Sequence, residues 1–473
     1  MQTCGKPYFL CEKEVNSSEN QGNMYLWAMK PSIKLPIEDF DYHLPEQSIA
    51  YTPASNRSDS KLLVWNKEII AESTYNYIAS FIPEKAALSF NNSKVIAARI
   101  HFQKANNSTI EIFCLEPSNN YQPISVAMQA TQKVEWICLV GGAKKWKEDY
   151  LEKEFELITP LNNDKDKIAT NNNNDNNNRV AIKVRAKKIK SIDGKFLIEF
   201  SWNNDSISFS EIIEHIGNIP LPPYIQRATT EEDKDRYQTT YAKHEGSVAA
   251  PTAGLHFNAA IFESLTEKKC STDFISLHVG AGTFMPVKTA AITDHEMHAE
   301  VFEITKATLI HLIEIANKKE LNPINYTPVI AVGTTTLRTI ESLYWLGVKL
   351  INNEKLQENK DLHLMQWDAY DNNNNDNSRQ TITVKEALST LLSWMQSHQM
   401  TQLITSTQLM IVPGYIFKIA NGLVTNFHQP KSTLLLIIAA ITGNKWKSIY
   451  QHAIDNQYRF LSYGDGCYFA INE

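Results

Sequence analysis

The stretch Pro328–Arg338, PVIAVGTTTLR, joins an apolar run to a glycine and a row of threonines. Pro328–Val332 has the length and aliphatic content of a buried strand, and Gly333–Thr336 follows it as a turn. We expect a helix to begin at Leu337, directly after this turn. A strand, a loop of small residues and a helix in this order form the basic unit of an α/β fold.

Two other segments repeat this order. Leu423–His428 is typical of a strand, Ser432 is a suitable N-cap for the apolar helix that follows, and Gly443 is suited to end that helix. Asp273–Val279 is typical of a third strand and runs into Gly280–Phe284, which is again rich in small residues. Three such units predict an α/β layer with a mainly parallel sheet.

In sheets of this kind the ligand crevice lies at the carboxyl ends of the strands. The glycines after the third strand would let backbone amides approach a ligand, although they do not form the GxGxxG pattern of a dinucleotide site. Thr334, Thr335 and Thr336 offer amides and hydroxyls at the positive end of a helix, which suits a carboxylate or a phosphate. Simple N-capping by one threonine is the alternative.

The middle of the chain has a different pattern. From about Lys94 to Ser210, short segments such as Thr109–Phe113 and Lys195–Phe200 alternate apolar and polar residues, as half-buried strands do. Several short strands with turns between them predict a small β-barrel. Asn171–Asn178, a run of asparagine broken by one aspartate, is too polar to pack and is expected to be a loop.

Composition narrows the class of protein. The chain has 473 residues, enough for two or three domains, and a net charge of −6 that does not by itself indicate a nucleic-acid binder. The basic clusters Lys144–Lys147 and Lys183–Lys190 are either binding patches or solvated faces. The six cysteines show no CxxC spacing, so we expect neither a disulfide framework nor a zinc site, and a cytoplasmic protein.

No membrane segment is predicted. The N-terminal residues lack the pattern of a signal peptide. The longest apolar run, Leu434–Ile441, is far shorter than the roughly 20 residues that span a bilayer, and it fits a buried helix better.

The segment Val248–Phe257 consists almost wholly of small residues, with Thr252 and His256 toward its end. Small residues allow backbone to come close to a ligand, and Gly254 also permits a positive φ. The segment is therefore predicted to line a ligand site. A tightly packed structural turn is the alternative.

The densest group of titratable residues is Asp294–Glu300, which contains His295, His298 and Glu300. It is not an HExxH motif, and metal binding is not expected. General acid–base work on a ligand is one interpretation, because histidine titrates near neutrality, and a structural network is the other. Tyr458–Asp465 could stack a base and fix a charged group, or it could be the last strand of the sheet.

Ten stretches, taken in chain order, resemble one known family. They are Phe40–Pro45, Asn92–Arg99, Pro220–Ile225, Tyr237–Ala242, Gly246–Phe257, His278–Phe284, His295–Glu300, Val332–Arg338, Thr425–Thr433 and Tyr458–Asp465. Together they resemble the S-adenosylmethionine:tRNA ribosyltransferase-isomerase family of queuosine synthesis. The resemblance extends from about residue 38 to residue 470.

The resemblance implies a three-layer α/β domain interrupted by an inserted small β-barrel domain. Residues 1–34 would then be an N-terminal extension. Residues 35–93 and 213–473 would form the discontinuous α/β catalytic domain. Residues 94–212 would form the barrel, with an Asn-rich loop at 161–179.

The resemblance also implies a reaction. The ribosyl part of S-adenosylmethionine is transferred to 7-aminomethyl-7-deazaguanine in tRNA and isomerised, giving epoxyqueuosine with release of adenine and methionine. The partners are then S-adenosylmethionine and a tRNA that carries the precursor. Because S-adenosylmethionine is consumed as a substrate, no cofactor is expected, and we expect a monomer.

Roles follow for named residues on the same basis. The candidates for proton transfer are His256, His295, His298 and Glu300. The candidates for substrate binding are Thr252, Gly254, Gly280, Gly282, Thr283, Thr334, Thr335, Thr336, Arg338, Asn426, His428, Arg459, Tyr463 and Asp465.

Some positions depart from the family pattern. Ser93, Ala97 and Gly466 stand where the family commonly has Thr, Pro and Ala, and the stretch from about Leu350 to Thr401 is longer than usual. A paralogue that acts on another amine, or a non-catalytic RNA-binding protein on the same scaffold, is therefore the alternative.

Overall fold

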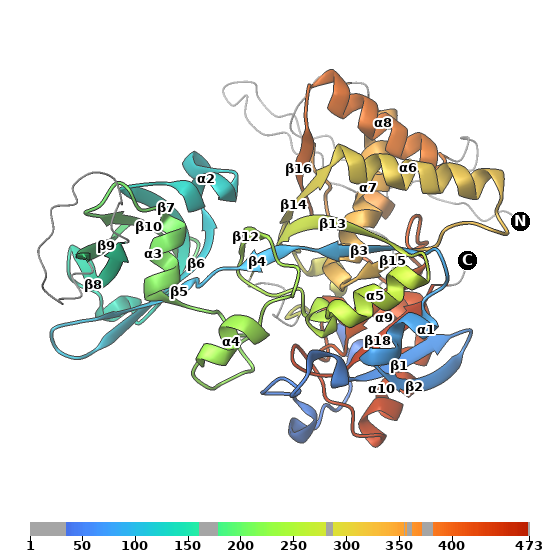
Figure 1. Cartoon of the computed structure of the whole chain (residues 1–473), viewed down its shortest axis with the longest axis horizontal. Coiled ribbons are helices and arrows are strands. Elements are labelled where there is room, and N and C mark those ends of the chain that lie inside the picture. Colours follow the sequence, from blue (N-terminus) through green and yellow to red (C-terminus); the bar gives the residue numbers. More distant parts are fainter. Residues whose placement is uncertain are drawn as a thin grey trace, which may run out of the picture.

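The structure, a computed structural model, describes residues 35–159, 178–280, 287–353, 355–356, 362–370 and 382–471. The predicted extension 1–34 and the predicted Asn-rich loop, apart from its last two residues, lie outside this part of the chain. Two large sheets, each with its own helices, make up the fold (Figure 1). Within the described ranges, no helix is both long enough and apolar enough to cross a membrane.

The larger sheet has nine strands. Their order is β16 (Gln402–Thr407), β14 (Glu300–Thr305), β13 (Ser271–His278), β3 (Ala87–Asn91), β15 (Val329–Val332), β17 (Gly422–Asn426), β18 (Gly466–Ala470), β1 (Lys61–Asn66) and β2 (Ile69–Thr74). The pairs β13–β3, β3–β15, β15–β17 and β18–β1 are parallel. The other four pairs are antiparallel. The prediction of a mainly parallel sheet is correct for the centre and wrong for the edges.

The edge departs from the prediction because β13 returns directly into its antiparallel neighbour β14. Between these strands the described residues contain one 3-10 turn, Ile292–Asp294, and no α-helix, so the helix of the third predicted unit is not found there. The other two units hold. The helix α7 (Thr334–Asn352) follows β15, and it begins at Thr334 rather than at Leu337. The helix α9 (Thr433–Thr442) follows β17, with the Ser432 hydroxyl accepting a hydrogen bond from the Leu435 amide as its N-cap.

Alternation along the central strands explains the layers of this sheet. In β15, Val329 and Ala331 join one buried cluster, while Ile330 and Val332 join another on the opposite face. The first cluster is shared with α6 (Lys306–Leu321), α7, α8 (Val384–Ser397), α9 and α10 (Trp446–Asp455). The second is shared with α1 (Ile78–Phe81) and α5 (Ala259–Glu267). Burial of both faces leaves the strand ends as the place for polar groups.

The smaller sheet is antiparallel and curled. It consists, in order, of β11 (Gly217–Asn218), β5 (Arg99–Gln103), β6 (Thr109–Pro117), β7 (Lys133–Gly141), β10 (Lys195–Trp202), β9 (Asn178–Ile192) and β8 (Tyr150–Thr159). Its core also takes the apolar sides of α2 (Ile124–Gln129) and α3 (Phe209–Ile216). The curl brings β8 near β5, where Lys153 Nζ donates to the His101 carbonyl at 3.3 Å.

The two basic clusters predicted from the sequence both lie on this smaller sheet and differ in how their side chains are paired. On β9, Lys183 and Arg185 share one carboxylate, Glu152 on β8, which offsets part of their charge within the sheet. Lys144, Lys145 and Lys147 instead are exposed around the buried Trp146. In the cluster on β9, Lys187 also pairs with Asp149, while Lys188 and Lys190 have no ion pair among the described residues, so both clusters keep positive charge to offer a partner.

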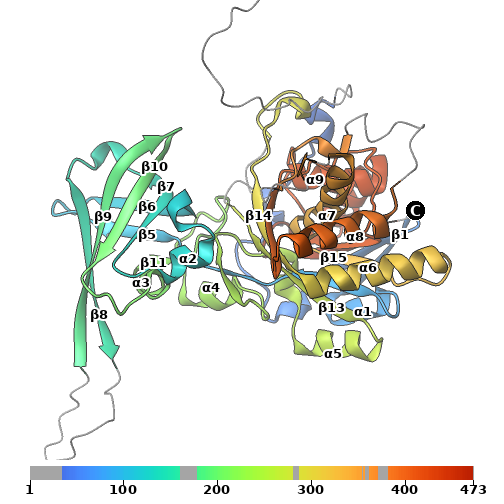
Figure 2. The ribbon, with the colours of Figure 1, turned by 90° about the horizontal axis from the view of Figure 1, so that it is seen from above.

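A two-stranded parallel ribbon lies between the two sheets (Figure 1), which the view from above shows on either side of it (Figure 2). It pairs β4 (Ser93–Val95), where the chain leaves the larger sheet, with β12 (His244–Ser247), where the chain returns. The returning segment contains α4 (Glu231–Arg236).

Asp233 of α4 ties the returning segment to the C-terminal loop. Its buried carboxylate accepts hydrogen bonds from Arg227 at 2.6 and 2.7 Å, from the Thr230 amide at 2.8 Å and from the Tyr463 hydroxyl at 2.8 Å. Burial works against ionisation, but these hydrogen bonds outweigh it and hold the pKa of Asp233 below its ordinary value.

This arrangement predicts a pH-dependent stability. A carboxyl group with a lowered folded-state pKa stabilises the fold above its unfolded pKa of about 3.9, and the stabilisation is lost as the pH falls below that value. Asp233→Asn should therefore reduce the free energy of unfolding by about 3 kcal/mol at pH 7. Urea denaturation at pH 7 and pH 3 should show the difference from the unaltered protein shrinking at pH 3. An equal difference at both pH values would contradict the role of the ionised carboxylate.

Candidate active site

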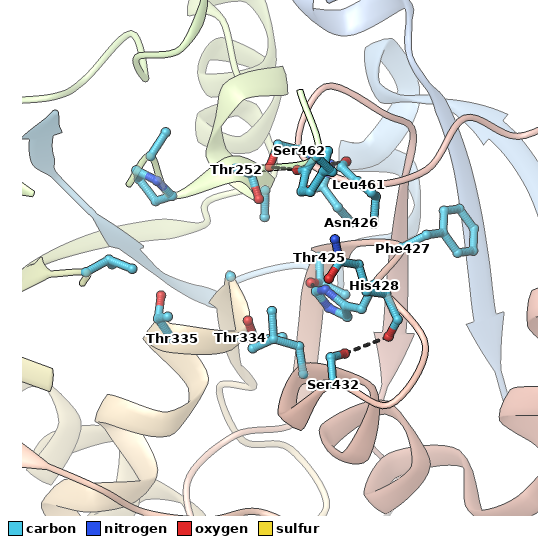
Figure 3. Close-up of a pocket in the computed structure, with 18 residues that line it drawn as sticks. Thr252, Thr334, Thr335, Thr425, Asn426, Phe427, His428, Ser432, Leu461 and Ser462 are labelled. Carbon is cyan, nitrogen blue, oxygen red and sulfur yellow. Dashed lines mark hydrogen bonds between the residues drawn. The ribbon is translucent and has the colours of Figure 1, made fainter. Parts of the chain in front are cut away.

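A cavity of about 70 Å³ lies at the carboxyl ends of β15 and β17 (Figure 3). The first turn of α7, the N-terminus of α9, the end of β17 and two loops surround it. Five of the predicted binding residues line it: Thr252, Thr334, Thr335, Asn426 and His428. The prediction that strand-end residues from separate units share one crevice is therefore consistent with the structure for these five.

The first turn of α7 is buried. Gly333 has a φ of 103°, a conformation that glycine adopts readily, and it turns the chain from β15 into the helix. Thr334, Thr335 and Thr336 are only 6%, 7% and 0% exposed. Among the described residues, no group accepts a hydrogen bond from their amides, and the Thr336 hydroxyl is buried without a partner. Unpaired amides at a helix N-terminus attract an anion.

The N-terminus of α9 reaches the same cavity. Ser432 lines the cavity, caps the helix through its hydroxyl and donates from that hydroxyl to the Gln429 carbonyl at 2.7 Å. Figure 3 shows Ser432 and Thr334 at the same side of the cavity, with Asn426 and His428 beside them. Two helix dipoles thus point their positive ends at one small space.

The end of β17 supplies buried neutral polar groups. Asn426 Nδ2 donates to the Leu461 carbonyl at 3.2 Å and lies 3.3 Å from His256 Nε2, while its Oδ1 has no partner within the described chain. His428 Nε2 lies 3.0 Å from the Thr425 hydroxyl. Burial lowers the pKa of His256 to about 4 and that of His428 to about 3. Both imidazoles are therefore neutral at pH 7.

His256 lies behind the cavity wall and does not line the cavity. Its ring stacks on Tyr75 with centroids 4.1 Å apart, and its Nδ1 lies 3.3 Å from the Arg57 carbonyl. Because only a protonated Nδ1 can donate to that carbonyl, Nε2 is left to accept from Asn426. The contacts of His256 in the structure thus orient Asn426.

A second cavity, of about 500 Å³, lies between the two sheets. One wall comes from the curled sheet and includes Pro117, Ile124 and Leu139. The opposite wall comes from β13 and β14 and their flanking residues. It contains Gly280, His298 and Glu300 of the predicted set. The two cavities adjoin, because Val279 lines both.

Glu300 and Arg338 form an ion pair with a hydrogen bond between their side chains. Arg338 Nη1 donates to Glu300 Oε2 at 2.9 Å, and both side chains are buried. The Glu300 carboxylate is therefore engaged by a neighbouring guanidinium in the structure. His298 is exposed and lines the second cavity, whereas His295 is half-buried and lies outside both cavities. Burial lowers the pKa of His295, and the nearby His298 lowers it further.

Three more predicted residues have contacts with the protein itself in the structure. A Cβ on Gly254 would lie 2.0 Å from the Tyr241 hydroxyl, so this glycine allows close packing. Asp465 accepts from the amides of Lys61 and Arg459 at 2.9 and 2.7 Å and thereby shapes the C-terminal loop, while Tyr463 donates to Asp233. None of them, nor Arg459, lines either cavity. Gly282 and Thr283 lie outside the described residues.

Several lining residues were not singled out from the sequence. Tyr224, Ser462 and Leu461 line the small cavity, and His278 and Glu303 line the large one. The sequence carried a usable signal for His278, which ends a strand directly before the glycine-rich loop. Glu303 carried none, because a glutamate within an alternating strand is typical of a solvent-facing position. Among described residues no cluster of three or more His, Cys, Asp or Glu side chains could hold a metal ion.

Comparisons with known proteins agree with the sequence motifs. A family model described as a queuosine biosynthesis protein matches residues 37–469. The S-adenosylmethionine:tRNA ribosyltransferase-isomerase of Treponema denticola is 31% identical over 440 residues, covering 90% of this chain and 98% of that relative. The enzyme of the same name from Halothermothrix orenii is 32% identical over 435 residues, covering 91% and 98%.

A solved structure also matches over most of the chain. The S-adenosylmethionine tRNA ribosyltransferase of Thermotoga maritima is 22% identical, covers 91% of this chain and 99% of its own, and has a TM-score of 0.39. The family match and the identities to the two curated relatives, which span about nine tenths of the chain, confirm the resemblance: the chain belongs to the queuosine biosynthesis family.

Proposed function

We propose that this chain is an S-adenosylmethionine:tRNA ribosyltransferase-isomerase. It transfers and isomerises the ribosyl moiety of S-adenosylmethionine onto 7-aminomethyl-7-deazaguanine in tRNA, giving epoxyqueuosine, adenine and methionine. Membership of the queuosine biosynthesis family and the names of relatives that match nearly end to end support this proposal. S-adenosylmethionine is consumed, so the reaction needs no separate cofactor.

The observation in the structure that carries the proposal is the pair of adjoining cavities at the strand ends. The small cavity has room for a head group rather than for a whole nucleoside. Its unpaired amides and two helix N-termini suit the carboxylate of the methionine portion. From there the sulfonium and the ribose extend past Val279 into the large cavity, where the tRNA base enters.

The unpartnered Oδ1 of Asn426 complements this arrangement. An amide oxygen accepts but does not donate, so it suits the α-ammonium group beside the carboxylate. The neutral His256 fixes the amide from behind, which keeps Oδ1 available. Among the other predicted residues, His298 and Glu300 line the large cavity and stay candidates for proton transfer there, as does His295 outside it.

The finer organisation of the fold also belongs to this proposal. The predicted bounds were 35–93 with 213–473 for a three-layer α/β domain and 94–212 for an inserted small β-barrel. Because α3 packs on the curled sheet and β11 belongs to it, we propose that the barrel extends to about residue 218. The two chain crossings at β4 and β12 support an insertion, and the approach of β8 to β5 supports a barrel-like curl.

The exposed Lys144, Lys145 and Lys147 on the curled sheet are suited to tRNA phosphates. The enzyme works as a cytoplasmic monomer.

An assay with defined substrates tests the activity. The purified chain should release adenine and methionine from S-adenosylmethionine only when tRNA bearing 7-aminomethyl-7-deazaguanine is present. The modified nucleoside should then have the mass of epoxyqueuosine. Chromatography of the small products and mass spectrometry of the digested tRNA measure both. Binding of S-adenosylmethionine without either product would sink the proposal.

Removal of the threonine hydroxyls tests the carboxylate site. Thr334→Val and Thr335→Val keep the shape of the side chain and lose one hydroxyl each. A hydrogen bond to a charged group contributes about 1.5–3 kcal/mol, so each variant should weaken the binding of S-adenosylmethionine about tenfold or more. Calorimetric titration measures this dissociation constant.

The exposed Thr266 on α5, remote from both cavities, provides the matched control. Thr266→Val should bind S-adenosylmethionine as the unaltered chain does. Unchanged binding by both cavity variants would remove the two hydroxyls from the carboxylate site.

A further inference from the structure

His278 and Glu303 form a histidine–carboxylate pair in the wall of the large cavity. His278 ends β13 and Glu303 lies on the adjacent β14. His278 Nε2 is 3.3 Å from Glu303 Oε1, and the two side chains are only 10% and 18% exposed. Both residues line the cavity.

The other ring nitrogen of His278 is unused. Its Nδ1 is buried and has no hydrogen-bond partner within the described chain. A carboxylate at Nε2 fixes the proton on that nitrogen, so Nδ1 keeps its lone pair and is the basic atom. Nδ1 faces the part of the cavity wall formed by Gly246 and Ile124.

Gly246 leaves room for this nitrogen. A Cβ at Gly246 would lie 2.9 Å from His278 Nδ1 and 2.8 Å from Ile124 Cγ2, and the φ of Gly246 is +135°. Any larger residue would push against the ring. The ribbon between the sheets therefore packs closely against the buried nitrogen, and only a residue without a side chain fits at position 246.

The other titratable groups of this cavity are engaged or exposed. Glu300 is held by Arg338 at 2.9 Å, and Glu116 lies 4.0 Å from Lys195 on the curled sheet. His298 is exposed. Of the described titratable residues that line the large cavity, His278 alone combines a fixed orientation with a buried, unpartnered basic atom.

We propose that His278 is the catalytic base of the ribosyl transfer, with Glu303 as its positioning residue. This assignment rests on the proposed function. Nδ1 takes a proton from the ribose carbon attached to the sulfonium: the C–H bond breaks, an N–H bond forms, and the electron pair stays on carbon beside the positive sulfur. The resulting imidazolium is stabilised by the Glu303 carboxylate.

The location of Val279 supports this role. Val279 directly follows His278 and lines both cavities, so a ligand whose carboxylate occupies the small cavity passes His278 as it enters the large one. The carbon next to the sulfonium is only a few bonds from the methionine head group. A base at residue 278 is thus at the point where the two cavities adjoin.

His278→Gln tests the assignment, because the glutamine amide can still donate to Glu303 while the basic Nδ1 is lost. The expected kcat for adenine release is at least about 100-fold lower, with the dissociation constant for S-adenosylmethionine within about threefold. The isotope effect on kcat for S-adenosylmethionine deuterated at the carbon beside sulfur should rise, because proton transfer becomes rate-limiting. Glu303→Gln should lower kcat about tenfold in the same way.

His311 and Asp273 provide the matched control. This second histidine–carboxylate pair joins α6 to β13 at 2.7 Å, outside both cavities. His311→Gln should keep the kcat of the unaltered protein.

Two outcomes would overturn the role of His278. One is a kcat for His278→Gln within about threefold of the unaltered protein. The other is a fall in kcat with no change in the isotope effect. If His278→Gln fails to fold, Glu303→Gln decides, and an unaltered kcat in that variant would overturn the pair. Failure of the unaltered protein to release adenine would instead contradict the proposed function itself.

Discussion

The site depends on one constraint, which is that the first turn of α7 is buried and its backbone amides need hydrogen-bond acceptors. The central strands β3, β15 and β17 are buried on both faces, so the chain that leaves β15 has to turn inside the protein. Gly333 makes that turn, and the amides of Thr334, Thr335 and Thr336 then face a buried space without a protein partner among the described residues. Buried unpaired amides are costly, at about 1–3 kcal/mol each, and an anionic ligand would remove that cost.

The rest of the site is arranged around this turn. Helix α9 brings a second N-terminus to the same space, and Asn426 supplies an amide oxygen held in place by a neutral histidine. On the other side of Val279 the cavity widens where the curled sheet faces β13 and β14. The curled sheet thus does not line the small cavity, but it forms one wall of the large cavity.

The sequence allowed much of the central fold to be predicted. Pro328–Thr336 and Leu423–Gly443 carried clear signals, because a buried parallel strand is continuously apolar and a helix start needs specific capping residues. The antiparallel pairs at the edges were not predicted. No local sequence pattern shows whether the chain that leaves β13 returns antiparallel to it, as β14 does. The start of α7 was placed three residues late, because threonine can equally precede a helix or begin it.

For the candidate site, local sequence predicted strand-end residues but not their partners. Thr334, Asn426 and His428 lie at one cavity as expected from the topology of parallel strands. The Glu300–Arg338 ion pair and the His278–Glu303 pair depend on neighbours across strands and helices, which a single sequence does not reveal. Gly254 and Asp465 were singled out for their residue type, although their contacts in the structure are with the protein itself.

A crystal structure of the protein with S-adenosylmethionine would test the central claim most directly. The claim predicts the methionine carboxylate about 2.7–3.2 Å from the amides of Thr334–Thr336, with the ribose beyond Val279 in the large cavity. A carboxylate bound elsewhere, with the first turn of α7 still unpaired, would contradict it.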